Sequence, residues 1–283
     1  MAEITAALVK ELRDKTQAGM MEAKKALVEA NGDLDAAIKA LREKNSKLTV
    51  KEGRTSAEGV IEAFVREHNK LGVLIEINSE TDFVARNEEF VALARELAKH
   101  AGENPTAASI DELLDATLAS TGSAARLRVQ ESFAKLRENI IFKRFVSFHS
   151  EDGTVDAYIH MGSQIGVLVE LANEGDEIKG LAREVAMHIA AARPKYLKRS
   201  DVPAEIIETE REIVRTRTMD DPKNASKPAE ILEKIIEGGL SNFFKANVLL
   251  DQPYIRDDKK TVAQLIAGKT EIKRYARFEI GEA

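Results

Sequence analysis

The residues of this 283-residue chain that could carry chemistry are its histidines, its carboxylates and one segment with partial likeness to a phosphate-binding loop. That segment, residues 263–270, ends in Gly-Lys-Thr, but a phosphate loop needs a glycine at its first position and a strand before it. Here the first position is Ala263, and the apolar spacing predicts a helix that runs into a turn. We therefore interpret Gly268 as a helix C-cap.

The other reactive side chains show no catalytic or metal-binding spacing. None of the five histidines lies in a His-x-x-x-His pattern, and no carboxylate stands in a recognisable catalytic setting. The chain has no cysteine, which excludes disulfides and thiol catalysis and fits a reducing compartment. We predict that the protein is not an enzyme and holds no cofactor and no metal. The histidines are His68, His100, His149, His160 and His188.

Composition narrows the class of protein further. An apolar content of 43% and a charged content of 32% are typical of a soluble globular chain of about two domains. No window is apolar enough to span a membrane, and the N-terminus lacks the features of a signal peptide. A net charge of −6 argues against a broad nucleic-acid surface. We expect a cytoplasmic protein that works among other proteins.

An internal repeat organises the middle of the chain. Residues 59–78 match residues 153–172 at an offset of 94, and residues 93–96 match residues 181–184 at an offset of 88. The equivalence places His100 opposite His188, which favours a structural role for both. Because the offsets differ by six, the first copy carries six extra residues between its strand and its helix. What one copy adds to a duplicated unit is the better candidate for function.

Thr81, Asp82, Phe83 and Val84 lie in this added segment, and two interpretations stay open. In the structural one, Thr81 or Asp82 caps the following helix and Phe83 folds back against it. In the functional one, Phe83 is an anchor for a pocket on another protein, where burying it is worth about 1.5–3 kcal/mol. Asp82 then adds a charge that disturbs or replaces a polar contact.

The first 44 residues predict three short helices with a marginal core. Asp33 is placed to cap the third helix. Met20 and Met21 are adjacent, so they cannot share a helix face, and we expect one in the core and one outside. They are either core-edge residues or a flexible apolar contact for a partner helix.

The remaining patterns predict an α+β fold with two related core subdomains, each with a small antiparallel sheet. Repeat two is interrupted by two amphipathic helices, which predict an inserted antiparallel coiled-coil hairpin that dimerises or contacts a partner. The expected organisation is a three-helix domain at 1–45, a linker at 46–56, one core subdomain at 57–140, the other at 141–195 and 245–283, and the hairpin at 196–244.

Several motifs together resemble the elongation factor Ts family over essentially the whole chain. They are Ile4 to Arg13, Gly19 to Leu27, Thr81 to Ala85, Ile165 to Val169, Ala186 to Ala191 and Lys227 to Gly238. Departures are Gln17 in place of a usual glycine, and Ala23 and Ser79 where cysteine often occurs. Some members continue into a C-terminal helical module that holds the partner, and we expect that contact to be missing here.

The resemblance implies a guanine-nucleotide exchange factor for the GTPase elongation factor Tu, with a ubiquitin-associated-like (UBA-like) N-terminal domain. It implies that Thr81, Asp82, Phe83 and Val84 enter the GTPase near its Mg²⁺ and help to dislodge it. It assigns the grip on the nucleotide domain to the opening helices, with Arg13, Met20 and Met21.

The partner would be that GTPase, with no direct nucleic-acid contact, and a homodimer or 2:2 complex through the hairpin is the further expectation. The alternatives are a UBA-like interaction module without exchange activity, and a hydrolase that uses Asp82.

Overall fold

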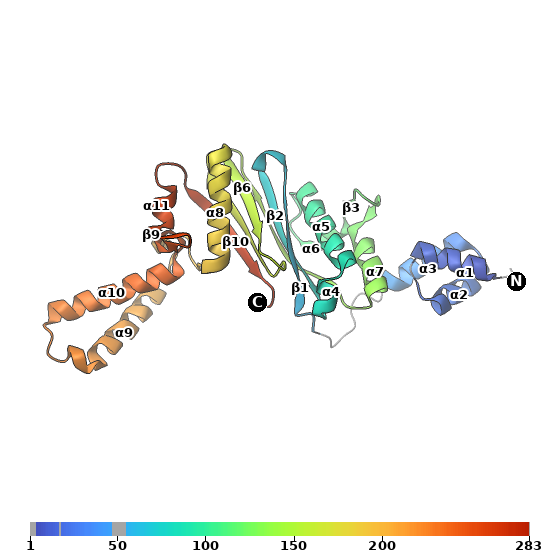
Figure 1. Ribbon diagram of the computed structural model, residues 1–283. Helices are drawn as coiled ribbons and strands as arrows, with labels where there is room; N and C mark the ends of the chain where they lie inside the picture. Colours follow the sequence, from blue (N-terminus) through green and yellow to red (C-terminus); the bar gives the residue numbers. More distant parts are fainter. Residues whose placement is uncertain (1–3, 17, 47–54, 283) are drawn as a thin grey trace.

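The structure, a computed structural model, describes residues 4–16, 18–46 and 55–282. Figure 1 shows three N-terminal helices at one end, two α+β units in the middle and a helical hairpin at the opposite end. Most of the expected linker at 46–56, and the departure at Gln17, lie outside the described residues. No helix within the described ranges is long and apolar enough to cross a membrane.

The three expected N-terminal helices are present. They are α1 (Ala6–Thr16), α2 (Met20–Glu29) and α3 (Leu34–Ser46). Their small core holds Leu12, Ala23 and Leu27, all fully buried. Asp33 caps α3 as predicted, because its Oδ1 accepts a hydrogen bond from Ala36 N at 3.0 Å.

The first α+β unit pairs β1 (Glu58–Val65), β2 (Leu71–Ser79) and β5 (Ile141–His149) in the order β1-β2-β5, all antiparallel. One face is covered by α5 (Glu88–Glu103), α6 (Ile110–Asp115) and α7 (Ala125–Leu136). Helix α7 begins directly after β4 (Ser123–Ala124), which pairs with β3 (Thr117–Leu118), and it ends where Arg137 takes a left-handed φ of 60°.

The second unit has the same plan. Its sheet has the order β10-β7-β6, from β6 (Gly153–Ile159), β7 (Ile165–Ala172) and β10 (Ile272–Glu279). The helices α8 (Asp176–Ala192) and α11 (Val262–Ile266) cover its outer face. The smaller elements here are β8 (Pro253–Tyr254) and β9 (Asp257–Thr261), with 3₁₀ turns at Arg199–Asp201 and Leu249–Asp251.

The expected start of the second subdomain at residue 141 is wrong. Strand β5 completes the first sheet, as β10 completes the second. The two third strands are themselves a repeat, since Lys143-Arg144 matches Lys273-Arg274 and Phe148 matches Phe278. Each strand even carries its register irregularity at the matched lysine. The repeated unit is therefore three strands and their covering helices, with the third strand of the second copy displaced by the hairpin.

The two sheets pack face to face, so the layers run helix, sheet, sheet, helix (Figure 1). Equivalent glycines allow this close approach. A Cβ on Gly72 would lie 2.6 Å from Val155 Cγ1, and one on Gly166 would lie 2.4 Å from Ile61 Cγ2. Because side chains of both units fill this layer, the units share one core and hold a fixed orientation.

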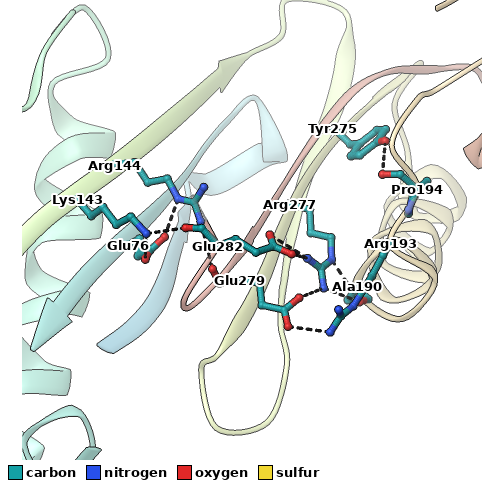
Figure 2. Close-up of polar contacts among 10 residues, drawn as sticks. All are labelled: Glu76, Lys143, Arg144, Ala190, Arg193, Pro194, Tyr275, Arg277, Glu279 and Glu282. Carbon is teal, nitrogen blue, oxygen red and sulfur yellow. Dashed lines mark hydrogen bonds and ion pairs between the residues drawn. The ribbon is translucent and has the colours of Figure 1, made fainter. Parts of the chain in front are cut away.

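Polar contacts join the same two units (Figure 2). The buried Glu76 on β2 accepts a hydrogen bond from Arg144 Nε at 2.6 Å and lies 3.2 Å from Lys143 Nζ. The Arg144 guanidinium then stacks over the ring of Phe278 in the other sheet. Glu170 and Arg274 repeat this arrangement in the second unit, with Arg274 over Phe148. The two sheets are thus joined by a reciprocal pair of cation–π contacts, and each arginine is held by a carboxylate of its own sheet.

The hairpin consists of α9 (Ala204–Asp220) and α10 (Ala229–Asn247), joined by a short turn at Pro222–Asn224. The pairing is antiparallel, because Arg211 meets Glu237 while Arg215 meets Glu233. The expected boundary at 244 falls inside α10, which continues to Asn247, where it joins the second unit through hydrogen bonds from Lys195 N and Tyr196 N to Asn247 O.

Candidate functional site

The buried histidines and the Gly-Lys-Thr segment contact other parts of the fold in ways that indicate a structural role. His100 Nε2 lies 2.8 Å from Leu113 O, and His188 Nε2 lies 3.0 Å from Gln252 Oε1; both rings are buried. Burial lowers the pKa of His188, against a smaller opposing effect of its bond with Gln252. Residues 263–270 form the end of α11 and a turn at Gly268, as expected. In the described ranges, no three metal-binding side chains cluster.

The added segment folds into a single helical turn, α4 (Asp82–Ala85), which we call, with its cap, the tongue (Thr81–Ala85). Thr81 caps this turn itself, since its Oγ1 accepts a hydrogen bond from Val84 N at 3.3 Å. The next helix, α5, is capped instead by Asn87. The capping interpretation was therefore right about Thr81 but assigned it to the wrong helix.

The tongue has an anchored side and a free side. Ala85 is buried and Val84 packs against the core of the first unit. Phe83 points away and is 83% exposed, so it does not fold back as a staple. Asp82 lies beside it in a surface ion pair with Arg86 at 3.0 Å. The aromatic ring of Phe83 is thus held in solvent, where another surface could bury it with a gain in free energy.

A second apolar surface lies on the N-terminal helices. Both Met20 and Met21 are exposed, at 62% and 76%, so the expectation that one of them enters the core is wrong. The small core is already filled by Leu12, Ala23 and Leu27. The methionines instead line a groove of about 580 Å³ with Arg13 on its rim, and its other lining residues are Ile4, Ala6, Val9, Lys10 and Lys24. We call this the N-terminal groove.

The lining of the groove combines apolar and basic side chains. Met20, Met21 and Val9 are apolar, while Lys10 and Arg13 supply positive charge. Methionine side chains adapt their shape to what they contact. This surface therefore suits a helix with an apolar face and acidic neighbours.

Sequence reasoning missed the residues that support the tongue. Glu138, which follows α7, accepts hydrogen bonds from both Thr81 N at 3.0 Å and Thr81 Oγ1 at 2.7 Å. In return, Glu80 Oε1 accepts a hydrogen bond from Asn139 N at 2.9 Å. Fifty-seven residues separate Thr81 from Glu138, so no local pattern could show this contact.

The fold is a duplicated α+β unit that exposes two apolar surfaces, the tongue tipped by Phe83 and the N-terminal groove. Comparison with known proteins gives the family. Residues 80–282 match the family model described as Elongation factor TS. The chain belongs to the elongation factor TS family, and its role is that of a nucleotide-exchange factor in translation elongation.

Similar proteins agree along nearly the full chain. The chain is 44% identical over 283 residues to elongation factor Ts of Alkalilimnicola ehrlichii, covering 99% of this chain and 92% of the relative. It is 41% identical over 289 residues to elongation factor Ts of Clostridium acetobutylicum, covering 99% and 93%. With the protein of Halothermothrix orenii the identity is 39% over 278 residues, covering 97% and 91%.

Proposed function

We propose that this protein binds elongation factor Tu in its GDP-bound form and promotes GDP release by inserting the tongue beside the Mg²⁺ of the GTPase. The observation that carries the proposal is Phe83, an aromatic residue held 83% exposed on a turn whose other side is anchored in the core. Thr81, Asp82, Phe83 and Val84 form the inserted surface.

The physical basis is linkage. A protein that binds the nucleotide-free GTPase more tightly than the loaded one must weaken nucleotide binding by the same factor. Mg²⁺ in such sites is held by a few ligands together with the phosphates, so displacing those ligands loosens GDP. Burial of Phe83 in the partner supplies about 1.5–3 kcal/mol toward that displacement. Asp82 brings a negative charge to a site already occupied by phosphates.

The N-terminal groove supplies the second contact. We assign the three helices to the UBA-like class, and assign Arg13, Met20 and Met21 to the grip on an apolar helix of the GTPase. A grip at a distance from the tongue allows binding energy to be used for displacement at the metal. The hairpin, which we interpret as an antiparallel coiled coil, offers a further surface for the GTPase or for a second copy in a homodimer or 2:2 complex.

The partner set is therefore the GTPase, with no direct nucleic-acid or membrane contact, in the cytoplasm. The net charge of −6 supports this, since nucleic-acid surfaces are basic. The alternative is a UBA-like interaction module with no exchange activity. Pull-down with elongation factor Tu against ubiquitin-like proteins separates the two.

The deciding measurement is the release of labelled GDP from elongation factor Tu with and without this protein. We expect wild type to accelerate release, and Phe83→Ala to fold normally but to lower the release rate at saturating concentration. Loss of the ring contact corresponds to about a tenfold or larger decrease, from its burial energy. Val28, also an exposed apolar residue but on α2, provides the control through Val28→Ala. Unchanged release with Phe83→Ala would refute insertion of the ring.

A further inference from the structure

The tongue is too short to hold its own shape. Its helix α4 has four residues, and helices of one turn do not persist in water because nucleation costs more than one turn returns. The cap bond from Val84 N to Thr81 Oγ1 is long, at 3.3 Å. The direction of Phe83 must therefore be fixed by contacts from outside the turn.

The packing of Val84 and Ala85 against the core supplies the apolar part of these contacts, and Glu138 supplies the polar part. Its two carboxylate oxygens are divided between the two donors of Thr81, with Oε2 accepting from the backbone N–H at 3.0 Å and Oε1 from the hydroxyl at 2.7 Å. A threonine hydroxyl has one proton. With that proton committed to Glu138, the oxygen lone pairs are left for the N–H of Val84. The carboxylate thus sets the orientation of the cap.

Glu138 itself is held from a rigid position. The next residue, Asn139, is fully buried, and its N–H donates to Glu80 Oε1 at 2.9 Å. Arg137, which precedes Glu138, ends α7 in the left-handed conformation, and Ile140, which follows Asn139, is buried. Each of the two segments therefore uses a glutamate to bind a backbone N–H of the other, and both ends of the contact are fixed to the core.

We propose that Glu138 is a positioning residue for nucleotide exchange: its carboxylate holds Thr81 so that the tongue presents Phe83 outward before a partner binds. The inference rests on the function proposed above. A preformed turn removes the cost of ordering the segment during binding, which is the benefit of preorganisation. Glu138 acts through Thr81 and is not required to touch the GTPase.

The test uses the full chain with Glu138→Ala and Glu138→Gln, and with Glu131→Gln as a matched control. Glu131 is an exposed glutamate on α7, so its substitution removes the same charge without touching the tongue. The first readout is amide hydrogen exchange of Thr81 and Val84 in the isolated protein. We expect it to quicken by about tenfold in Glu138→Ala, the factor that corresponds to one hydrogen bond to a charged group, and to be unchanged in Glu131→Gln.

The second readout is GDP release from elongation factor Tu as a function of factor concentration. We expect the maximal rate to fall by about tenfold in Glu138→Ala and by about threefold in Glu138→Gln, because glutamine keeps one acceptor oxygen. The half-saturating concentration should change by less than about twofold, since the N-terminal groove is intact.

Three results would overturn the inference. One is unchanged amide exchange at Thr81 and Val84. Another is an equal loss in the alanine and glutamine variants, which would indicate a charge effect. The third is a change confined to the half-saturating concentration, which would make Glu138 a contact residue. If Glu138→Ala fails to fold, Glu138→Gln is compared directly with wild type and with Glu131→Gln for amide exchange and for the maximal release rate. Phe83→Ala in the same assay separates failure of this inference from failure of the proposed function. If the proposed function is wrong, Phe83→Ala leaves the rate of GDP release unchanged; if only the inference about Glu138 is wrong, Phe83→Ala still lowers that rate.

Discussion

Two neighbouring glycines in α10 separate helix packing from helix propensity within the hairpin. A Cβ on Gly239 would lie 2.4 Å from Cγ1 and 3.0 Å from Cγ2 of Val214 on α9, whereas a Cβ on Gly238 meets no atom within 4 Å. Valine in a helix has one strongly preferred rotamer, so Val214 cannot turn both methyl groups away. The same substitution should therefore stabilise the hairpin at Gly238 but not at Gly239.

The magnitudes follow from the contacts. Replacing glycine by alanine in a helix interior gains about 1 kcal/mol at either position. Overpacking at Gly239 costs about 1–3 kcal/mol, because the close approach of the two helices must open to admit the methyl group. We expect Gly238→Ala to stabilise the hairpin by about 1 kcal/mol. We expect Gly239→Ala to leave it unchanged or to destabilise it by up to about 2 kcal/mol.

Amide hydrogen exchange along α9 and α10 measures this locally, since it reports the free energy of opening of each cooperative segment. Adding Val214→Ala to Gly239→Ala removes the methyl groups that clash and should recover most of the loss. Equal protection in the two glycine variants, or no recovery in the double variant, would refute the claim that Gly239 sets the distance between the helices.

Three further predictions concern other parts of the molecule. Burial lowers the pKa of His188, so below about pH 6.5 the unfolded state binds more protons than the folded state, and the free energy of unfolding should fall as the pH drops. His188→Gln should lack this component of the pH dependence, whereas His149→Gln, a substitution at an exposed histidine, should retain it. Urea midpoints at about pH 7.5 and about pH 5.5, on either side of the transition, measure the difference. Glu76→Gln should lower the free energy of unfolding by about 2–4 kcal/mol. The effect should be smaller than for a fully buried ion pair, because Lys143 and Arg144 are both partly exposed. An unchanged urea midpoint would contradict this. Met21→Ser should raise the half-saturating concentration for GDP release by about tenfold with the maximal rate unchanged, whereas Val28→Ser should alter neither.

Local patterns predicted the elements well. The periodicity of the first 44 residues predicted three helices, and Asp33 caps the helix that it was expected to cap. The offset repeat between residues 59–78 and 153–172 gave the paired hairpins of the two sheets. These features depend on neighbours in sequence, where side-chain spacing and capping act directly.

The third strands show where local reasoning stopped. Residues 141–149 were assigned to the second subdomain but form a strand of the first sheet, because strand-forming residues do not specify which sheet edge they join. A signal existed in the match of Lys143-Arg144 and Phe148 with Lys273-Arg274 and Phe278, at an offset of 130 residues. The inserted hairpin lengthens the chain before the third strand of the second copy. The offset of 94 that relates the first two strands therefore does not reveal the match of the third strands.

By itself the sequence determined the helices, the paired strands and the added segment that carries Phe83, because each of these features depends on side chains close together along the chain. Only the tertiary structure decided that Phe83 faces solvent, that both Met20 and Met21 line a groove, and that Glu138 holds Thr81. Exposure depends on what already fills the neighbouring core, and the Thr81–Glu138 contact, across 57 positions of sequence, depends on where β2 and α7 end in space.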